Sequence, residues 1–259
     1  MKKTIALLFA FITILSMSAC RIEKVYDNKQ PKQTYELPLS GFSSISNNSN
    51  CDIHFTQSDT YKVTLKASKQ WYDTHNIIVK GGTLKISLKK TNKEKGVTIL
   101  NFTNYDSGAE LWISAPSLSY IGMYGSGDII AENDLNGENL QIEVAGSGST
   151  TLKGVSLSGD IEYSVAGSGD VQTGLVKAKN AKFYIAGSGS IKTGLEKVDK
   201  TEVSVAGSGE ATVNFNNCGF ANVEVAGSGG ITLSGQLKRL DKDVAGSGDI
   251  DTSKLQISK

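Results

Sequence analysis

The tripeptide Gly-Ser-Gly occurs seven times in the second half of the chain at almost constant spacing. Successive copies are separated by 21, 21, 20, 20, 20 and 19 residues. A period this regular indicates a repeat protein, because a unit of about twenty residues is too short to bury a core alone and must stack on its neighbours. The first glycines of the copies are Gly125, Gly146, Gly167, Gly187, Gly207, Gly227 and Gly246.

Apolar residues recur four and two positions before each Gly-Ser-Gly, and a residue that is mostly polar stands between them. This alternation predicts a β-strand with one buried face, and a third apolar position four residues after the first glycine predicts a second strand. Lys242 interrupts the first of these apolar columns in the last copy. The second column consists of Met123, Val144, Val165, Ile185, Val205, Val225 and Val244.

These features predict an all-β fold in which residues 121–259 form a right-handed parallel β-helix with about 20 residues per coil. Each strand is expected to pair in parallel with its counterpart one coil away, about 4.8 Å distant. Glycine suits the corner because it adopts positive φ without the steric cost of a Cβ atom. The handedness follows from the general preference for right-handed crossovers. Leucine-rich repeats and β-propeller blades do not fit the spacing or the strand number.

The first residues have the features of a secretion signal. Lys2 and Lys3 precede an apolar run that is shorter than the ~20 residues a membrane-spanning helix needs, so residues 1–19 are expected to be a signal peptide. The following Ser18-Ala19-Cys20 resembles the lipobox of bacterial lipoproteins, which implies cleavage before Cys20 and a lipid on its thiol. The alternative is an ordinary cleaved signal with an incidental cysteine.

A lipid on Cys20 would place the protein in the cell envelope, with the membrane as its first partner. Arg21, where an inner-membrane lipoprotein would carry Asp, favours the outer membrane. Residues 20–35 are polar and lack apolar periodicity, so they are expected to be a tether. Of the remaining cysteines, Cys51 and Cys218 are expected to be separate buried thiols, and a disulfide is the alternative.

Residues 36–120 are expected to be a β-rich region that starts the solenoid and covers the exposed end of its sheets. Residues 53–55 and 61–65 alternate around a turn, and residues 77–79 and 84–88 flank Gly81-Gly82, so two hairpins are predicted. Only residues 67–75 have a helical character.

Several segments resemble one known family. They are Phe42-Ser-Ser-Ile45, Asp52-Ile-His-Phe-Thr-Gln57, Leu84-Lys-Ile-Ser-Leu88, Ala115-Pro-Ser-Leu118 and the repeated Val-Ala-Gly-Ser-Gly-Asp. Together they are similar to the head GIN domain family of proposed auto-transporter adhesins, over roughly residues 36–250. The resemblance implies a secreted or lipid-anchored parallel β-helix and brings no established catalytic residues.

No arrangement of residues predicts catalysis, a metal site or a cofactor. Acidic residues follow Gly-Ser-Gly in some copies and are read as turn residues. They are too few to form a ladder of cation sites, because a hard cation needs six to eight oxygen ligands. His54 is expected at a solvent-facing strand position. Trp71 and Trp112 are expected to pack in the core or cap, with a sugar-stacking role as the alternative. The central serines would form a hydroxyl ladder without a histidine base, and this candidate binding ladder consists of Ser126, Ser147, Ser168, Ser188, Ser208, Ser228 and Ser247.

Three functions remain open at this point. The first is a non-catalytic surface binding or adhesion module whose partner is a glycan or a surface protein. The second is a structural envelope protein without a soluble ligand, and the third is a carbohydrate-active β-helix enzyme, which the absence of a carboxylate constellation disfavours. Nucleic acid is not an expected partner, because 27 basic residues are balanced by 26 acidic ones.

Overall fold

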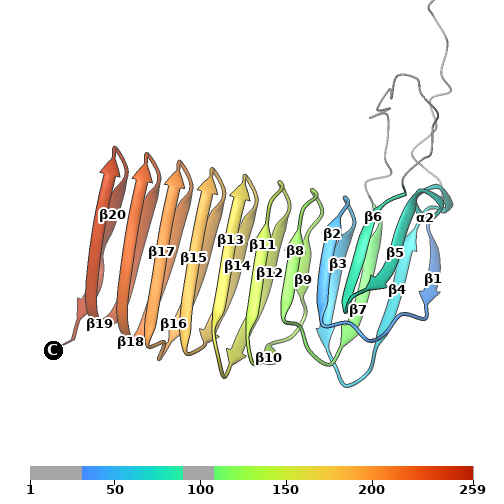
Figure 1. Ribbon diagram of the computed structural model, residues 1–259, viewed down its shortest axis with the longest axis horizontal. Coiled ribbons are helices and arrows are strands. Elements are labelled where there is room, and N and C mark those ends of the chain that lie inside the picture. The colour runs from blue at the N-terminus through green and yellow to red at the C-terminus, as the bar shows by residue number, and fades with distance from the viewer. Residues whose placement is uncertain (1–30, 90–107, 259) are drawn as a thin grey trace, which may run out of the picture. The chain divides into compact units, whose positions relative to one another are not determined.

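The computed structural model describes residues 31–89 and 108–258. The predicted signal peptide, Cys20 and all but the last residues of the predicted tether lie outside this range. Within it the chain forms a parallel β-solenoid of about seven turns with a short antiparallel cap at its N-terminal end (Figure 1). The predicted all-β solenoid is therefore confirmed.

Two sheets face each other across the core. Sheet 1 runs, in spatial order, through β5 (His75–Lys80), β6 (Thr83–Leu88), β2 (Ser44–Asn48), β8 (Tyr120–Met123), β11 (Leu140–Val144), β13 (Ile161–Gly167), β15 (Asn180–Gly187) and β17 (Lys200–Gly207). Sheet 2 runs through β1 (Gln33–Leu37), β4 (Lys62–Ala67), β7 (Glu110–Ala115), β3 (Asp52–Gln57), β9 (Ile129–Ala131), β12 (Ser149–Leu157), β14 (Asp170–Lys177) and β16 (Ser190–Glu196).

The last strands join the two sheets. β18 (Glu210–Gly227) and β19 (Gly230–Gly246) each begin in sheet 2 and bend into sheet 1, and β20 (Asp249–Ile257) ends sheet 2. The short β10 (Leu135–Gly137) pairs with the C-terminal part of β12.

The apolar columns read from the repeat are real files of stacked side chains. Val205 pairs in register with Ile185 on one side and Val225 on the other, and all three are buried. Tyr163 also lies wholly inside, where its hydroxyl is 2.8 Å from Thr173 Oγ1 on the opposite sheet. Each coil therefore contributes one apolar layer to a core that no single coil encloses.

The Gly-Ser-Gly corner is tight for two different reasons. Ser208 N donates to Gly187 O of the preceding coil at 2.9 Å, and Gly207 has a φ of +117°, which side chains other than glycine rarely adopt. At the second glycine the constraint is space: a Cβ on Gly209 would lie 2.5 Å from Ile185 Cγ2 and 2.6 Å from Gly189 O. The corner therefore excludes a Cβ atom at both positions.

Replacing Gly209 with Ala should destabilise the solenoid by about 1–3 kcal/mol, because the added methyl overpacks the contact between coils. Gly230→Ala is the matched control, since a Cβ there meets nothing within 4 Å. Thermal melting followed by circular dichroism measures both variants. Equal melting temperatures for the two would contradict this account of the corner.

The N-terminal region corrects one of the two hairpin predictions. β3 and β4 are not paired; β7 lies between them, parallel to β3 and antiparallel to β4. The chain does bend between these two strands, but a strand from much later in the chain lies between them. The second hairpin is confirmed: β5 and β6 are antiparallel, and Gly81 and Gly82 both have positive φ.

The region also divides differently from expectation. β2 with β3 and β6 with β7 extend the two sheets as further coils, whereas β1, β4 and β5 close the end with antiparallel pairings. β1 begins at Gln33, so Gln33–Tyr35 of the predicted tether belong to a strand.

A short helix completes the cap. α2 (Lys69–Thr74) begins after Ser68, whose hydroxyl accepts a hydrogen bond from Trp71 N, and confirms the helical character of this segment. Trp71 is 2% exposed and stacks on His75 with ring centroids 3.9 Å apart. The expectation that Trp71 packs in the core is confirmed.

The cap should lose stability as the solution becomes acidic. Burial lowers the pKa of His75, and the nearby charge of Lys89 acts in the same direction. Because an unfolded histidine titrates near 6.5, the unfolded chain takes up this proton first, and stability falls as the pH drops below about 6.5. Melting temperatures between pH 7.5 and 5 should show this slope, and a His75→Phe variant should show less of it. An unchanged slope in the variant would exclude His75 as its source.

The two cysteines of the described part lie in the core. Cys51 and Cys218 are both buried and unpaired, as expected.

In the last coil, Lys242 stands in register with the buried Val223 but is itself exposed, and Val244 is 42% exposed. The apolar files thus stop at a charged residue.

Candidate functional site

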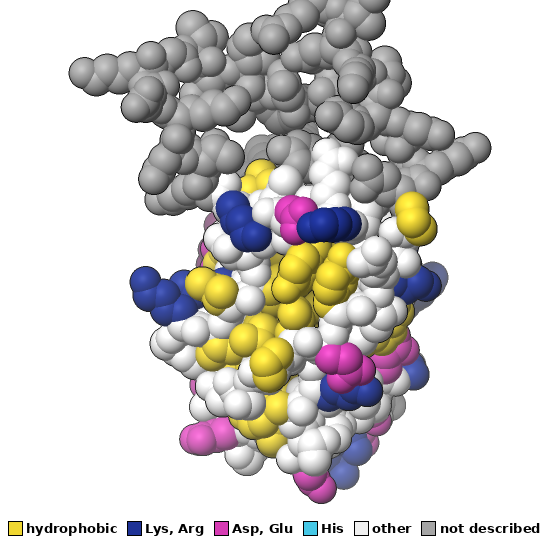
Figure 2. Space-filling model, turned by 90° about the vertical axis from the view of Figure 1, so that its right-hand side faces the viewer, with side chains coloured by type: hydrophobic (Ala, Val, Ile, Leu, Met, Phe, Trp, Pro, Cys, Tyr) yellow, Lys and Arg dark blue, Asp and Glu magenta, His cyan; other side chains and the backbone are white. Residues whose placement is uncertain are grey.

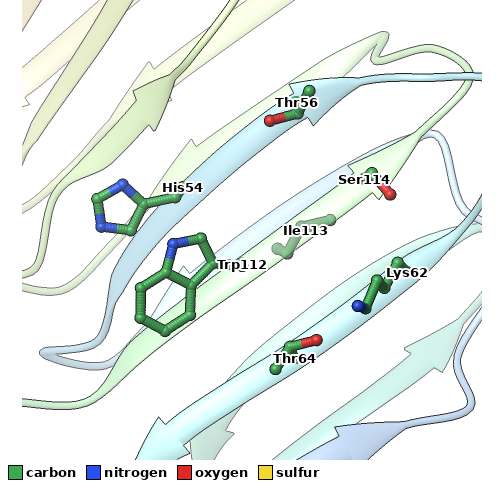
Figure 3. A pocket seen from close by; sticks show the side chains of 7 residues that line it. All are labelled: His54, Thr56, Lys62, Thr64, Trp112, Ile113 and Ser114. Carbon is green, nitrogen blue, oxygen red and sulfur yellow. The ribbon is translucent and has the colours of Figure 1, made fainter.

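A groove of about 420 Å³ lies on the outer face of sheet 2, near its capped end (Figure 3). It crosses three neighbouring strands, β3, β7 and β4, and is lined by their outward side chains together with the inward-facing Ile113. The lining residues are His54, Thr56, Lys62, Thr64, Trp112, Ile113 and Ser114.

Strand alternation and register place these side chains together. His54 on β3 pairs with Trp112 on β7, and Trp112 pairs with Thr64 on β4. The residues on either side of each one point inward and are buried, as Ile53 and Phe55 are around His54. A row of three outward side chains from three strands therefore runs across the groove.

Trp112 is the aromatic centre of this row. Its side chain is 38% exposed, and its ring stacks on that of His54 with centroids 5.4 Å apart and planes 12° apart (Figure 3). The expectation that Trp112 packs in the core or cap is therefore wrong, because an outward strand position on an open sheet face leaves the indole accessible. His54 does occupy the expected outward position.

Glu132 fixes the histidine from its far side. Glu132 Oε1 lies 2.8 Å from His54 Nδ1. In the neutral imidazole the carboxylate accepts the Nδ1–H, which leaves Nε2 as a hydrogen-bond acceptor. The histidine ring is thus held against Trp112 by a stacking contact on one side and a hydrogen bond on the other.

Polar groups surround the aromatic ring. Thr64 Oγ1 is buried and has no hydrogen-bond partner among the described residues, whereas Ser114 Oγ donates to Thr60 O at 2.9 Å. Lys62 lies at one margin and is 3.8 Å from Glu36, with most of its side chain in solvent. The groove thus combines an apolar ring face with hydroxyls, an imidazole acceptor and one ammonium group, and its lining includes no carboxylate.

The predicted serine ladder exists as a file of residues but lies elsewhere. Each Gly-Ser-Gly serine is exposed at the same corner of its coil, and backbone hydrogen bonds join successive corners, as between Ser228 N and Gly207 O at 2.9 Å. None of these serines lines the groove.

The residues that follow Gly-Ser-Gly form a second file with alternating charge. In chain order they are Asp128, Ser149, Asp170, Ser190, Glu210, Gly230 and Asp249, so no acidic residue lies directly over another. Asp170 Oδ1 accepts hydrogen bonds from Ser190 N and Ser190 Oγ at 2.9 and 2.6 Å. Asp128 accepts the corresponding bonds from Ser149, so these two carboxylates satisfy groups of the next coil rather than the local turn amides that their reading as turn residues implied.

One further polar cluster lies on the outer face of sheet 1. The hydroxyls of Tyr120 and Tyr124 contact each other, and each donates to Glu143 Oε2 at 2.8 Å. Gly122 lies between the two tyrosines and leaves room for their rings. Burial, together with the contacts to Tyr124 and Glu143, raises the pKa of Tyr120. The three groups satisfy one another.

Among residues 31–89 and 108–258, no three His, Cys, Asp or Glu side chains lie close enough together to hold a metal ion. No helix in that part of the chain has the length and hydropathy needed to cross a membrane.

The geometry defines a capped parallel β-solenoid with an open groove on one sheet. A family profile described as "Putative auto-transporter adhesin, head GIN domain" matches residues 41–219, and the chain belongs to this family. The resemblance read from the sequence is thereby confirmed. No curated protein matches the chain.

Solved structures share the fold over most of the chain. One is a putative adhesin from Bacteroides fragilis, 24% identical, with a TM-score of 0.73 over 86% of this chain and 98% of that one. Another is a putative adhesin from Parabacteroides distasonis, 18% identical with a TM-score of 0.68, over the same shares of the two chains. A third, from the same species, is called a putative lipid binding protein; it is 25% identical, with a TM-score of 0.62 over 86% of this chain and 97% of that one.

Proposed function

We propose that the protein is a lipid-anchored, non-catalytic binding module of the cell envelope whose groove at Trp112 receives a sugar ring of a surface glycan. The observation that carries the proposal is the exposed indole, stacked on His54 and surrounded by hydrogen-bonding groups. Membership in a family described as adhesins supports a binding role at the cell surface.

The groove has the two kinds of contact that a sugar needs. A pyranose presents an apolar face of C–H groups, which the indole ring covers, and a rim of hydroxyls, which need donors and acceptors. His54 Nε2 supplies an acceptor, the exposed Thr56 hydroxyl supplies both functions, and Lys62 supplies a charged donor. An open groove on a flat sheet also admits a ring within a longer chain, rather than only a free monosaccharide.

Binding without cleavage is favoured by the groups around the indole. Glycoside hydrolysis uses two carboxylates on either side of the bond to be broken. Glu132 is engaged with His54, and the residues that line the groove include no carboxylate. The outer membrane remains the proposed location, on the basis of Cys20 and Arg21.

Glycan binding should depend on the indole. On an array of bacterial and host glycans, Trp112→Ala should lose about tenfold or more in affinity, equivalent to about 1.4 kcal/mol. Trp112→Phe should keep part of the affinity, and Leu175→Ala, which removes a side chain that is 45% exposed elsewhere on sheet 2, should keep all of it.

Each other outcome of this experiment has a distinct meaning. Retention that is unaffected by Trp112→Ala would move the site away from the groove. The absence of any retained glycan would favour a structural envelope role, and release of shorter saccharides would indicate an enzyme.

Membrane retention should depend on Cys20. In cells that express the full chain, Cys20→Ser should move the protein from the membrane fraction to the soluble fraction, because the thiol that carries the lipid is lost. Cys218→Ala is the control, since this thiol is buried and should not affect fractionation. Recovery of the Cys20 variant with the membranes would contradict lipid anchoring.

A further inference from the structure

The capped end of the solenoid leaves apolar side chains in solvent. Ile78 on β5 is 47% exposed, Leu88 at the end of β6 is 48% exposed, and Tyr72 on α2 is 37% exposed. Leu37 and Ile77 are only partly buried beside them. Figure 2, which views this end directly, shows apolar side chains gathered on it with basic and acidic side chains around them. The two sheets thus end here in the antiparallel strands β1 and β5, and part of the apolar surface stays exposed.

The same end carries an excess of positive charge. Residues 31–89 contain seven lysines and four acidic residues. Lys62 and Lys69 are within ion-pair distance of Glu36 and Asp73, respectively. No ion pair among the described residues involves Lys66, Lys80, Lys85 or Lys89. Lys89 Nζ donates to Asp73 O at 2.8 Å, but none of these four ammonium groups has a carboxylate partner among the described residues. Positive groups around an apolar patch suit a surface that is both apolar and negatively charged.

The path of the chain brings this end towards a lipid anchor. The chain enters the folded part at Gln33, in the strand β1 that ends sheet 2 at the cap. The segment from Cys20 to Gln33 can extend over at most about 45 Å. This step rests on the proposed anchoring through Cys20. A chain held in that way would keep its capped end, rather than β20, near the lipid.

We propose that this end, here called the basal surface and defined by Leu37, Tyr72, Ile78 and Leu88 with Lys80, Lys85 and Lys89, lies against an anionic membrane. Its aliphatic and aromatic side chains enter the headgroup region, and its lysines pair with lipid phosphates. Each contact is weak alone, but the anchor gives the surface a high effective concentration at the membrane. The groove at Trp112 lies on the side of the solenoid rather than on its end, so it remains open.

Vesicle binding by the anchor-free chain tests this surface separately from both Cys20 and the glycan. A chain beginning at Arg21 keeps every described strand, and all of the buried core lies between Phe42 and Ile250. It should float with vesicles of phosphatidylglycerol and phosphatidylcholine, and less with phosphatidylcholine alone. Raising the salt concentration should release it, since exposed charges are then screened.

Substitutions at the two ends of the solenoid provide the comparison. Ile78→Ser and Lys80→Glu should each reduce the partition coefficient, and the lysine change should do so by about fivefold or more, because a lysine near an anionic surface contributes about that factor. Ile257→Ser and Lys254→Glu are the controls at the far end, where Ile257 is 52% exposed. Circular dichroism melting should be similar for all four variants.

Three results would overturn the proposal. The first is no flotation with anionic vesicles at low salt, and the second is an equal loss of the partition coefficient in the variants of both ends. The third is sedimentation that shows a dimer abolished by Ile78→Ser, which would make a second copy of the chain the occupant of this surface. Trp112→Ala should float normally. Failure of glycan binding with intact flotation, or the reverse, therefore separates the two proposals.

Discussion

The backbone contact between successive Gly-Ser-Gly corners is the constraint on which the rest of the structure depends. It brings one coil so close to the next that a Cβ atom on Gly209 would collide with the carbonyl of Gly189. This close approach fixes the register, and the register puts Ile185, Val205 and Val225 into one buried file. The outward side chains are aligned by the same pairing, so the corners determine the surface as well as the core.

The fold of the repeat region could be predicted because its long-range contacts join residues that are a nearly constant number of positions apart in the sequence. A residue about twenty positions away is the neighbour, so alternation within one coil also identifies the side chains above and below it. The N-terminal region has no such period. β7 separates β3 from β4, and nothing local to residues 53–65 could reveal this, because both pairings bring together distant parts of the chain.

Only part of the groove could be predicted from the sequence, for the same reason. Alternation around His54 indicated an outward side chain, but its stacking partner Trp112 and its carboxylate partner Glu132 come from separate strands whose register the sequence did not show. The serine ladder, in contrast, was easy to find because it repeats. Repetition marked the scaffold, whereas the chemically mixed groove lies where the repeat is absent.

Lys242 interrupts an apolar file at the C-terminal edge of sheet 1. It occupies, on the outermost strand of sheet 1, the position that Val223 fills one coil earlier. A further strand added beyond β19 would enclose that ammonium group among aliphatic side chains, at a cost of several kcal/mol without a counter-ion. The open edge of sheet 1 thus carries a charged side chain in line with an apolar file, which makes this edge a poorer template for strand addition than an aliphatic one.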